Sequence, residues 1–263
     1  MLGQYAMQSP LPGRDILRVE GLEVDFDGFK ALRSLDFRVQ AGELRFLIGP
    51  NGAGKTTLLD VMCGKVKPSH GRVVFKDSID ISKFQEHQLA ELGIGRKFQA
   101  PSVFTTLTVF ENLALSMKQK RGLLSALWAK TTSEQRDRLL HRLEMIGLQD
   151  KAAARAGSLS HGEKQWLEIG MLLMQEPDLL LLDEPAAGMT DSETEKTGEL
   201  LHAISNNQTI IVVEHDMEFV RRFAKTVTVL HEGTVLREGT MEDIQSDDKV
   251  AEVYLGRRVE RDA

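Results

Sequence analysis

One short segment constrains the fold of this chain more than any other: a glycine-rich loop preceded by an apolar strand pattern and followed by a helix pattern. The loop consists of Gly49, Pro50, Asn51, Gly52, Ala53, Gly54, Lys55, Thr56 and Thr57. Leu44 to Ile48 runs straight into it, and Thr56 to Cys63 reads as a helix that Gly64 ends. A loop of this pattern in this setting predicts a P-loop that binds the phosphates of a nucleotide.

The residue types of the loop suit that chemistry. Glycine has no Cβ, so the backbone can fold around phosphates and turn its N–H groups and the following helix N-terminus toward the anion. Lys55 adds a positive charge for the β- and γ-phosphates, and the Thr56 hydroxyl is suited to Mg²⁺. We therefore expect the loop to bind ATP with Mg²⁺. The loop alone does not distinguish a kinase, a GTPase and a transport ATPase.

A strand that ends in two carboxylates narrows the choice. Leu179 to Leu182 is a run of four leucines, and Asp183 and Glu184 follow it directly. In a nucleotide site the first carboxylate is placed to hold Mg²⁺ through its water shell, and the second is placed to polarise the attacking water. We predict these roles for Asp183 and Glu184.

The rest of the chain predicts an α/β fold. Strand patterns alternate with helix patterns, which implies a parallel sheet covered on both faces. The stretch from Pro101 to Gly157 is mainly helical and predicts an insertion. Further strands are expected at Leu17–Val24, Leu35–Val39, Arg72–Phe75 and Thr209–Val213, helices at Gly162–Met174 and Ser192–Ala203, and a closing hairpin at Thr226–Leu230 and Thr234–Arg237.

Composition excludes some classes of protein. Lys and Arg number 33 and Asp and Glu 39, a net charge of −6, which argues against a broad basic face for nucleic acid. The single cysteine, Cys63, allows no intrachain disulfide and reads as a small packing residue. No run approaches ~18 apolar residues, so no membrane span is expected. The first residues lack a signal-peptide pattern, and we read 1–14 as a flexible tail.

Leu159-Ser160-His161-Gly162-Glu163 lies one predicted helix before the two carboxylates. It resembles the signature motif of ATP-binding cassette (ABC) proteins, in the family's order of signature and then acidic strand end. The resemblance implies a P-loop NTPase (RecA-like) core with a parallel sheet, an antiparallel β subdomain and a helical insertion subdomain. It places the ATPase domain at 15–256, the helical subdomain at about 101–165, and a C-terminal tail at 257–263.

The resemblance also implies how the site is shared. In this family two subunits enclose two ATP molecules, and the signature of one completes the phosphate site of the other. It carries over to Ser160 and Gly162, which offer a hydroxyl, a backbone N–H and a helix N-terminus to the γ-phosphate. Two residues depart from the usual motif, His161 and Glu163, and Thr190 stands where the family usually has an aspartate.

Three further roles come only from the resemblance. Gln99 corresponds to the glutamine that reaches Mg²⁺ or the attacking water, at the edge of the helical insertion. His215 corresponds to the histidine that contacts the γ-phosphate. Phe26 is expected to stack on the adenine, with Phe29 as its rival for that position.

The distance between two motifs and the likeness of several short segments indicate which kind of ABC protein this is. Lys55 and Leu159 are 104 residues apart, which leaves no room for the long coiled coil of DNA-repair members. The chain is identified as the detached ATPase of a membrane importer in the branched-chain amino acid and urea branch. The segments that carry the likeness are 95–99, 159–168, 183–189, 213–217 and 253–256. Segments 183–189 and 213–217 resemble the branch as a whole, and 95–99, 159–168 and 253–256 are most similar to the urea importer. A branched-chain amino acid importer and, less favoured, a soluble non-transport ATPase are the alternatives.

That reading implies partners and a location. We expect a second ABC subunit, in a homodimer or a heterodimer, together with transmembrane permease subunits and, indirectly, a solute-binding protein, but no nucleic acid. The chain would act at the cytoplasmic face of the inner membrane as a peripheral subunit. The segment Pro101 to Thr108, with apolar Val103 and Phe104, is the expected contact for a permease.

Overall fold

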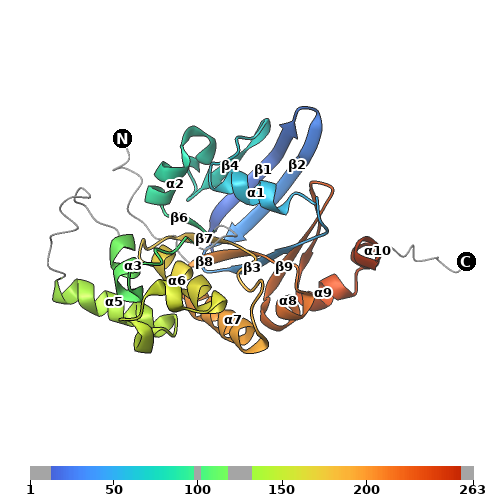
Figure 1. Ribbon diagram of the computed structural model, residues 1–263. Coiled ribbons are helices and arrows are strands. Elements are labelled where there is room, and N and C mark those ends of the chain that lie inside the picture. Colours follow the sequence, from blue (N-terminus) through green and yellow to red (C-terminus); the bar gives the residue numbers. More distant parts are fainter. Residues whose placement is uncertain (1–12, 98–101, 118–131, 256–263) are drawn as a thin grey trace, which may run out of the picture.

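The computed structural model describes residues 13–97, 102–117 and 132–255 of the 263-residue chain (Figure 1). A six-stranded sheet forms the centre, in the order β10-β9-β3-β8-β7-β6. Its strands are β3 (Leu44–Ile48), β6 (Ile94–Lys97), β7 (Leu179–Asp183), β8 (Thr209–Val213), β9 (Thr226–His231) and β10 (Thr234–Gly239). All neighbours in this sheet are parallel except β9 and β10, which form the expected antiparallel hairpin.

The central strands are buried on both faces, which explains their apolar runs. Successive side chains of a strand point to opposite faces. In β7, Leu179 and Leu181 pack into one hydrophobic core, and Leu180 and Leu182 pack into the other. The run of leucines therefore holds two cores together and fixes the sheet edge at which Asp183 and Glu184 emerge.

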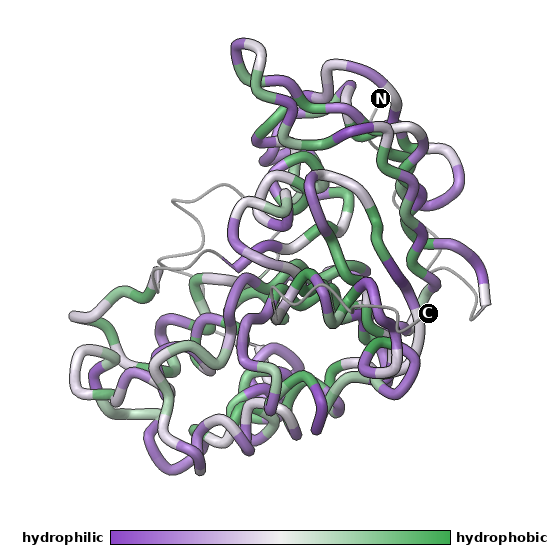
Figure 2. The backbone as a smooth tube through the Cα atoms, turned by 90° about the vertical axis from the view of Figure 1, so that its right-hand side faces the viewer, coloured by the Kyte–Doolittle hydropathy of each residue, from purple (hydrophilic) through white to green (hydrophobic). Residues whose placement is uncertain are grey.

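The first core lies under a second, antiparallel sheet of order β2-β1-β4-β5. This sheet occupies the top of Figure 1 together with α1 and α2, and in Figure 2 hydrophobic and hydrophilic segments alternate along its long strands, as one buried face requires. Its elements are β1 (Asp15–Phe26), β2 (Phe29–Gln40), β4 (His70–Phe75) and β5 (Ile79–Asp80), with α1 (Lys55–Met62), η2 (Ile81–Lys83) and α2 (Glu86–Leu92) beside them.

The second core is covered by helices on the opposite face of the central sheet. The insertion contributes α3 (Val109–Ser116), α5 (Ser133–Met145) and the short turns η3 (Gln149–Lys151) and η4 (Ala156–Ser158). The remaining helices are α6 (His161–Leu173), α7 (Asp191–Ser205), α8 (Met217–Phe223), α9 (Met241–Gln245) and α10 (Asp248–Leu255). Within the described ranges, no helix has the length and apolar character needed to cross a bilayer.

The α/β prediction, with its antiparallel sheet and helical insertion, is confirmed. Each predicted strand is present, and two, Leu44–Ile48 and Thr209–Val213, have the predicted bounds. Several short elements were missed: β5, β6, α2, α8, α9 and α10. They are too short for hydrophobic periodicity to identify. Cys63 is buried as a packing residue. The expected N- and C-terminal tails, 1–14 and 257–263, lie almost wholly outside the described residues.

Candidate functional site

The glycine-rich loop joins β3 to α1, as its pattern predicts. Two of its glycines are required by close backbone approach as well as by positive φ. A Cβ at Gly49 would lie 2.2 Å from the carbonyl oxygen of Leu230, and one at Gly54 would lie 2.8 Å from that of Ala31. The loop is therefore held between the β9–β10 hairpin and β2.

Lys55 begins α1 and is buried inside the loop. Its Nζ donates to the carbonyl oxygen of Gly49 over 2.7 Å and to that of Pro50 over 3.0 Å. Burial lowers the pKa of Lys55, while the charges of Glu184 and Asp183 oppose that shift. The ammonium is thus within electrostatic range of Glu184 and Asp183, and its carbonyl contacts are ones that phosphate oxygens could replace.

Asp183 ends β7 and is 2% exposed. Burial raises the pKa of Asp183, and the nearby Arg96 guanidinium opposes that change. Arg96 Nη2 lies 3.9 Å from Asp183 Oδ2, whereas Oδ1 is buried without a hydrogen-bond partner among the described residues. An orphaned buried carboxylate oxygen fits a hydrated Mg²⁺.

The described residues contain no group of three His, Cys, Asp or Glu side chains able to hold a metal alone. This also fits Mg²⁺, which is bound through one or two carboxylates together with substrate phosphates. Thr56, at the start of α1, is the second candidate ligand on the chain. Gln99, the third, lies outside the described residues.

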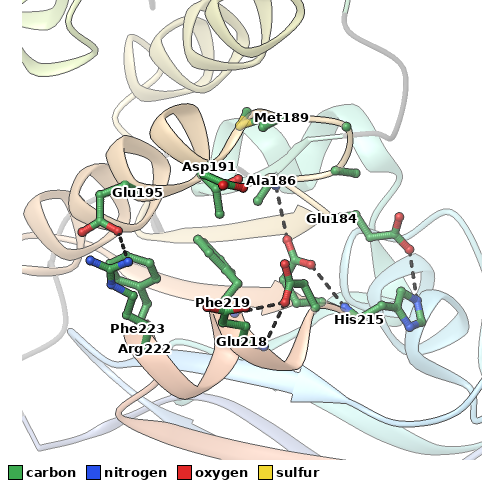
Figure 3. A pocket seen from close by; sticks show the side chains of 15 residues that line it. Glu184, Ala186, Met189, Asp191, Glu195, His215, Glu218, Phe219, Arg222 and Phe223 are labelled. Carbon is green, nitrogen blue, oxygen red and sulfur yellow. Dashed lines mark hydrogen bonds and ion pairs between the residues drawn. The ribbon is translucent and has the colours of Figure 1, made fainter.

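Glu184 follows Asp183 in a left-handed backbone conformation, with φ of 48°. Its Oε1 lies 3.0 Å from Nε2 of His215, which follows β8. Figure 3 shows the two side chains pointing toward one another. The sequence predicted each residue separately; the parallel pairing of β7 with β8, which places Asp183 opposite Val213, brings them together.

Glu214 is a residue of this site that the sequence prediction missed. It is 3% exposed, and its two carboxylate oxygens accept from different backbone groups. Oε1 accepts from the N–H of Ala186 and Oε2 from the N–H of His215, each over 3.2 Å. Burial raises the pKa of Glu214 to about 7. Its only sequence signal was a charged residue directly after an apolar strand.

A pocket of about 430 Å³ opens beside this carboxylate. It lies between the segment that follows β7 and the helix α8 that follows β8. Figure 3 shows Ala186, Met189 and Asp191 on one side and Phe219, Arg222 and Phe223 on the other. Glu184 and His215 stand at its edge, so the pocket adjoins the two groups that the sequence assigns to chemistry.

The signature residues are found at the start of α6. Ser160 is the N-cap: its Oγ accepts from the N–H of Glu163, whose carboxylate accepts from the N–H of Ser160. Within the described ranges, no hydrogen bond joins Ser160 or Gly162 to the glycine-rich loop of the same chain. Ser160 and Glu163 thus cap each other's backbone N–H, and the predicted phosphate contact of Ser160 and Gly162 remains a prediction.

A buried ion pair joins β6 to α6. Lys97 ends β6 and its Nζ lies 3.9 Å from Oε2 of Glu168 on α6, with both side chains almost fully buried. Glu168 Oε1 accepts from the N–H of Ser102. One carboxylate of α6 therefore contacts the residues on either side of segment 98–101.

The two aromatic candidates for adenine both face solvent. Phe26 is 48% exposed and Phe29 is 63% exposed, at the turn between β1 and β2. Neither ring is in the core, because the two-residue hairpin tip projects beyond the sheet. Tyr254, from the last helix, also approaches the loop: burial raises its pKa to about 12, and a hydrogen bond with the backbone of Gly49 opposes that shift.

Comparison with known proteins agrees with this geometry. The sequence profile of the family described as "ABC transporter" matches residues 32–187. The "High-affinity branched-chain amino acid transport ATP-binding protein LivG" of Escherichia coli (strain K12) is 37% identical over 250 residues, covering 92% of this chain and 98% of LivG. The corresponding protein BraF of Pseudomonas aeruginosa is 32% identical over 252 residues, with the same coverage.

Solved structures agree as well. The ADP conformation of MJ1267, an ATP-binding cassette of an ABC transporter, superposes with a TM-score of 0.80 at 31% identity, covering 93% of this chain and 100% of MJ1267. The dimeric cassette MJ0796 gives 0.71 at 27% identity, covering 86% and 98%. LivG and BraF are named for branched-chain amino acids and not for urea, so they do not support the finer urea prediction. The chain belongs to the ABC transporter family and is an ATP-hydrolysing subunit of it.

Proposed function

We propose that this chain is the ATPase of an importer for branched-chain amino acids. The observation that carries the substrate is the likeness to LivG, at 37% identity over 98% of its length. The sequence favoured urea as the transported solute and left branched-chain amino acids as the alternative. The proposal adopts that alternative. Nothing in the nucleotide site encodes the solute, because the permease and the solute-binding protein would select it.

The nucleotide roles proposed here combine the family resemblance with the contacts described above. Lys55 and the loop N–H groups bind the ATP phosphates, and Phe26 or Phe29 stacks on the adenine. Thr56 and Asp183, with Gln99, hold Mg²⁺, which supplies charge neutralisation when bound. Glu184 accepts the proton of the attacking water, and His215 holds its carboxylate in place.

The site is half complete in one subunit. The second half is Ser160 and Gly162 of another subunit, either a second copy or a related cassette. The Ser160 hydroxyl and the Gly162 N–H, at a helix N-terminus, are donors of a kind that suits the γ-phosphate. The MJ0796 cassette, 27% identical, is described as dimeric, which supports this arrangement.

The loop after segment 98–101 suits a permease contact. The Phe104 side chain is 54% exposed. Its backbone is fixed, because its N–H donates to Asn112 Oδ1 over 2.8 Å and its carbonyl oxygen accepts from Asn112 Nδ2 over 3.1 Å. Asn112 is fully buried, so an exposed aromatic ring is presented on a rigid support.

The substrate is tested by deleting the gene and measuring uptake of labelled leucine and labelled urea in parallel. We expect leucine uptake to be lost and restored by the wild-type gene, but not by Lys55→Ala. Loss of urea uptake alone would favour the urea importer. Retention of both would contradict an importer role in either case.

A further inference from the structure

The hydroxyl of Ser160 already has an anionic partner within its own chain. Ser160 Oγ donates to Glu193 Oε1 over 2.8 Å. Ser160 caps α6 and Glu193 lies in the first turn of α7, so the contact joins two helices. A serine hydroxyl has one hydrogen to donate, and Glu193 accepts it.

The same carboxylate also fixes the segment that follows the acidic strand end. Glu193 Oε2 accepts from the N–H and from the Oγ1 of Thr190, each over 3.0 Å. The hydrogen bonds from Thr190 and from Ser160 lower the pKa of Glu193, so it is ionised at neutral pH. Thr190, which replaces the aspartate usual in the family, therefore orients a neighbouring carboxylate.

The first turn of α6 leaves room for the carboxylate of Glu193. A Cβ at Gly162 would lie 2.6 Å from Cδ of Glu193, so a side chain there would expel the carboxylate. His161, one of the two departures from the usual signature, places Nε2 3.2 Å from the carbonyl oxygen of Ala187. The signature and segment 187–193 are thus joined at two points.

We propose that Glu193 is a positioning residue that engages Ser160 in the nucleotide-free subunit and must release it before Ser160 can bind the γ-phosphate held by a second subunit. The inference rests on the proposed function, since it takes Ser160 as a phosphate ligand. Carboxylate and phosphate oxygens are both anionic acceptors, so they compete for one hydrogen and repel each other. Glu193 thereby raises the ATP concentration needed for dimer closure.

The chain contains a matched control for this carboxylate. At the start of α3, Glu111 Oε2 accepts from the N–H of Thr108 over 2.7 Å and from its Oγ1 over 2.9 Å. This is the same cap that Glu193 makes with Thr190. Glu111→Gln therefore reproduces the effect of Glu193→Gln on a helix cap without touching the signature.

The test measures dimer formation by sedimentation velocity as Mg·ATP is titrated into the full chain carrying Glu184→Gln, which slows turnover. We expect Glu193→Gln to lower the ATP concentration for half-maximal dimer by roughly threefold to tenfold, the range of a partly exposed charged contact. Glu111→Gln should leave it unchanged. An unchanged or higher ATP requirement with Glu193→Gln would overturn the proposal.

A second measurement examines the contact without nucleotide. Denaturant unfolding of Ser160→Ala, Glu193→Gln and the double variant gives the coupling between the two side chains. We expect the combined effect on the unfolding equilibrium constant to differ from the product of the single effects by about twofold or more. If the two substitutions have additive effects on the free energy of unfolding, Ser160 and Glu193 do not interact in the folded chain, and the proposal is wrong. If the contact is present but no variant dimerises with ATP, the proposed function fails and the inference about closure fails with it.

Discussion

Oε1 of Glu184 and Nε2 of His215 lie 3.0 Å apart, at the ends of two adjacent parallel strands. Both side chains are partly exposed, at 31% and 42%, so the pair is open to water on one side. The ring orients one oxygen of the carboxylate and leaves the other available. This is the arrangement that a general base for a water molecule requires.

Glu184→Gln should slow ATP hydrolysis while ATP binding is retained, because the amide keeps the shape of the side chain but cannot accept a proton. We expect kcat to fall by about 10²-fold or more, the usual contribution of a general base. Steady-state phosphate release and nucleotide titration measure the two effects. Glu144→Gln, on the exposed face of α5, is the control. Wild-type turnover in Glu184→Gln would show that another group is the base.

His215→Ala should lower kcat through Glu184 and leave the affinity for ATP less affected. If the ring acts by orienting that carboxylate, its effect should largely disappear when Glu184 is already Gln, because residues that act as a unit are not additive. The kcat values of the two single variants and the double variant measure this. Full additivity would instead indicate that His215 acts directly on the phosphate.

Lys55→Ala should weaken ATP binding because it removes the charge that faces the phosphates. It also removes two hydrogen bonds to the carbonyl oxygens of Gly49 and Pro50, so the loop should lose some order without nucleotide. We expect Kd for ATP to rise by about tenfold or more, since hydrogen bonds to charged groups contribute roughly 1.5–3 kcal/mol. Calorimetric titration gives Kd, and Lys67→Ala, an exposed lysine after α1, is the control. Equal Kd values in both variants would contradict the assignment.

An interaction could be predicted from the sequence when its residues lie close together along the chain, and not when they are far apart. The glycine-rich loop and the leucine strand are local patterns, and each could be predicted because its chemistry lies within a few neighbouring residues. The contacts of Glu184 with His215 and of Ser160 with Glu193 join residues about thirty positions apart. These contacts depend on strand register and helix packing, which cannot be predicted from a local sequence pattern.

The buried carboxylate of Glu214 shows the same limit. Its hydrogen-bond partners are backbone N–H groups, which every sequence contains, so its position after an apolar strand alone did not distinguish it from an exposed glutamate. Only the parallel pairing of β7 with β8 reveals that it ties the segment after one strand to the segment after the next.

Glu214 should also make stability depend on pH. Its pKa is 4.5 ordinarily and about 7 in the fold, where Glu184, His215 and Asp216 flank it. The folded state therefore binds more protons between these values, and the stability that this group contributes falls as pH rises from about 4.5 to about 7, then stays level. Glu214→Gln, which stays neutral, should remove that fall, worth up to about 3 kcal/mol. Denaturant unfolding at pH 5, 6, 7 and 8 measures it. A variant with the wild-type pH dependence would contradict the shift.

The ion pair of Lys97 and Glu168 should be important for stability, since both side chains are almost fully buried. Lys97→Met leaves a buried carboxylate without this cation, which we expect to cost about 3 kcal/mol of unfolding free energy. Burial already raises the pKa of Glu168, and the positive charge of Lys97 opposes that change. Adding Glu168→Leu should recover part of the loss, because the Glu168 carboxylate would then no longer be buried without its cation. Denaturant unfolding of both single variants and the double variant tests this, with Lys249→Met as an exposed control. A double variant less stable than the sum of the single effects predicts would show that the pair is not the reason for the loss.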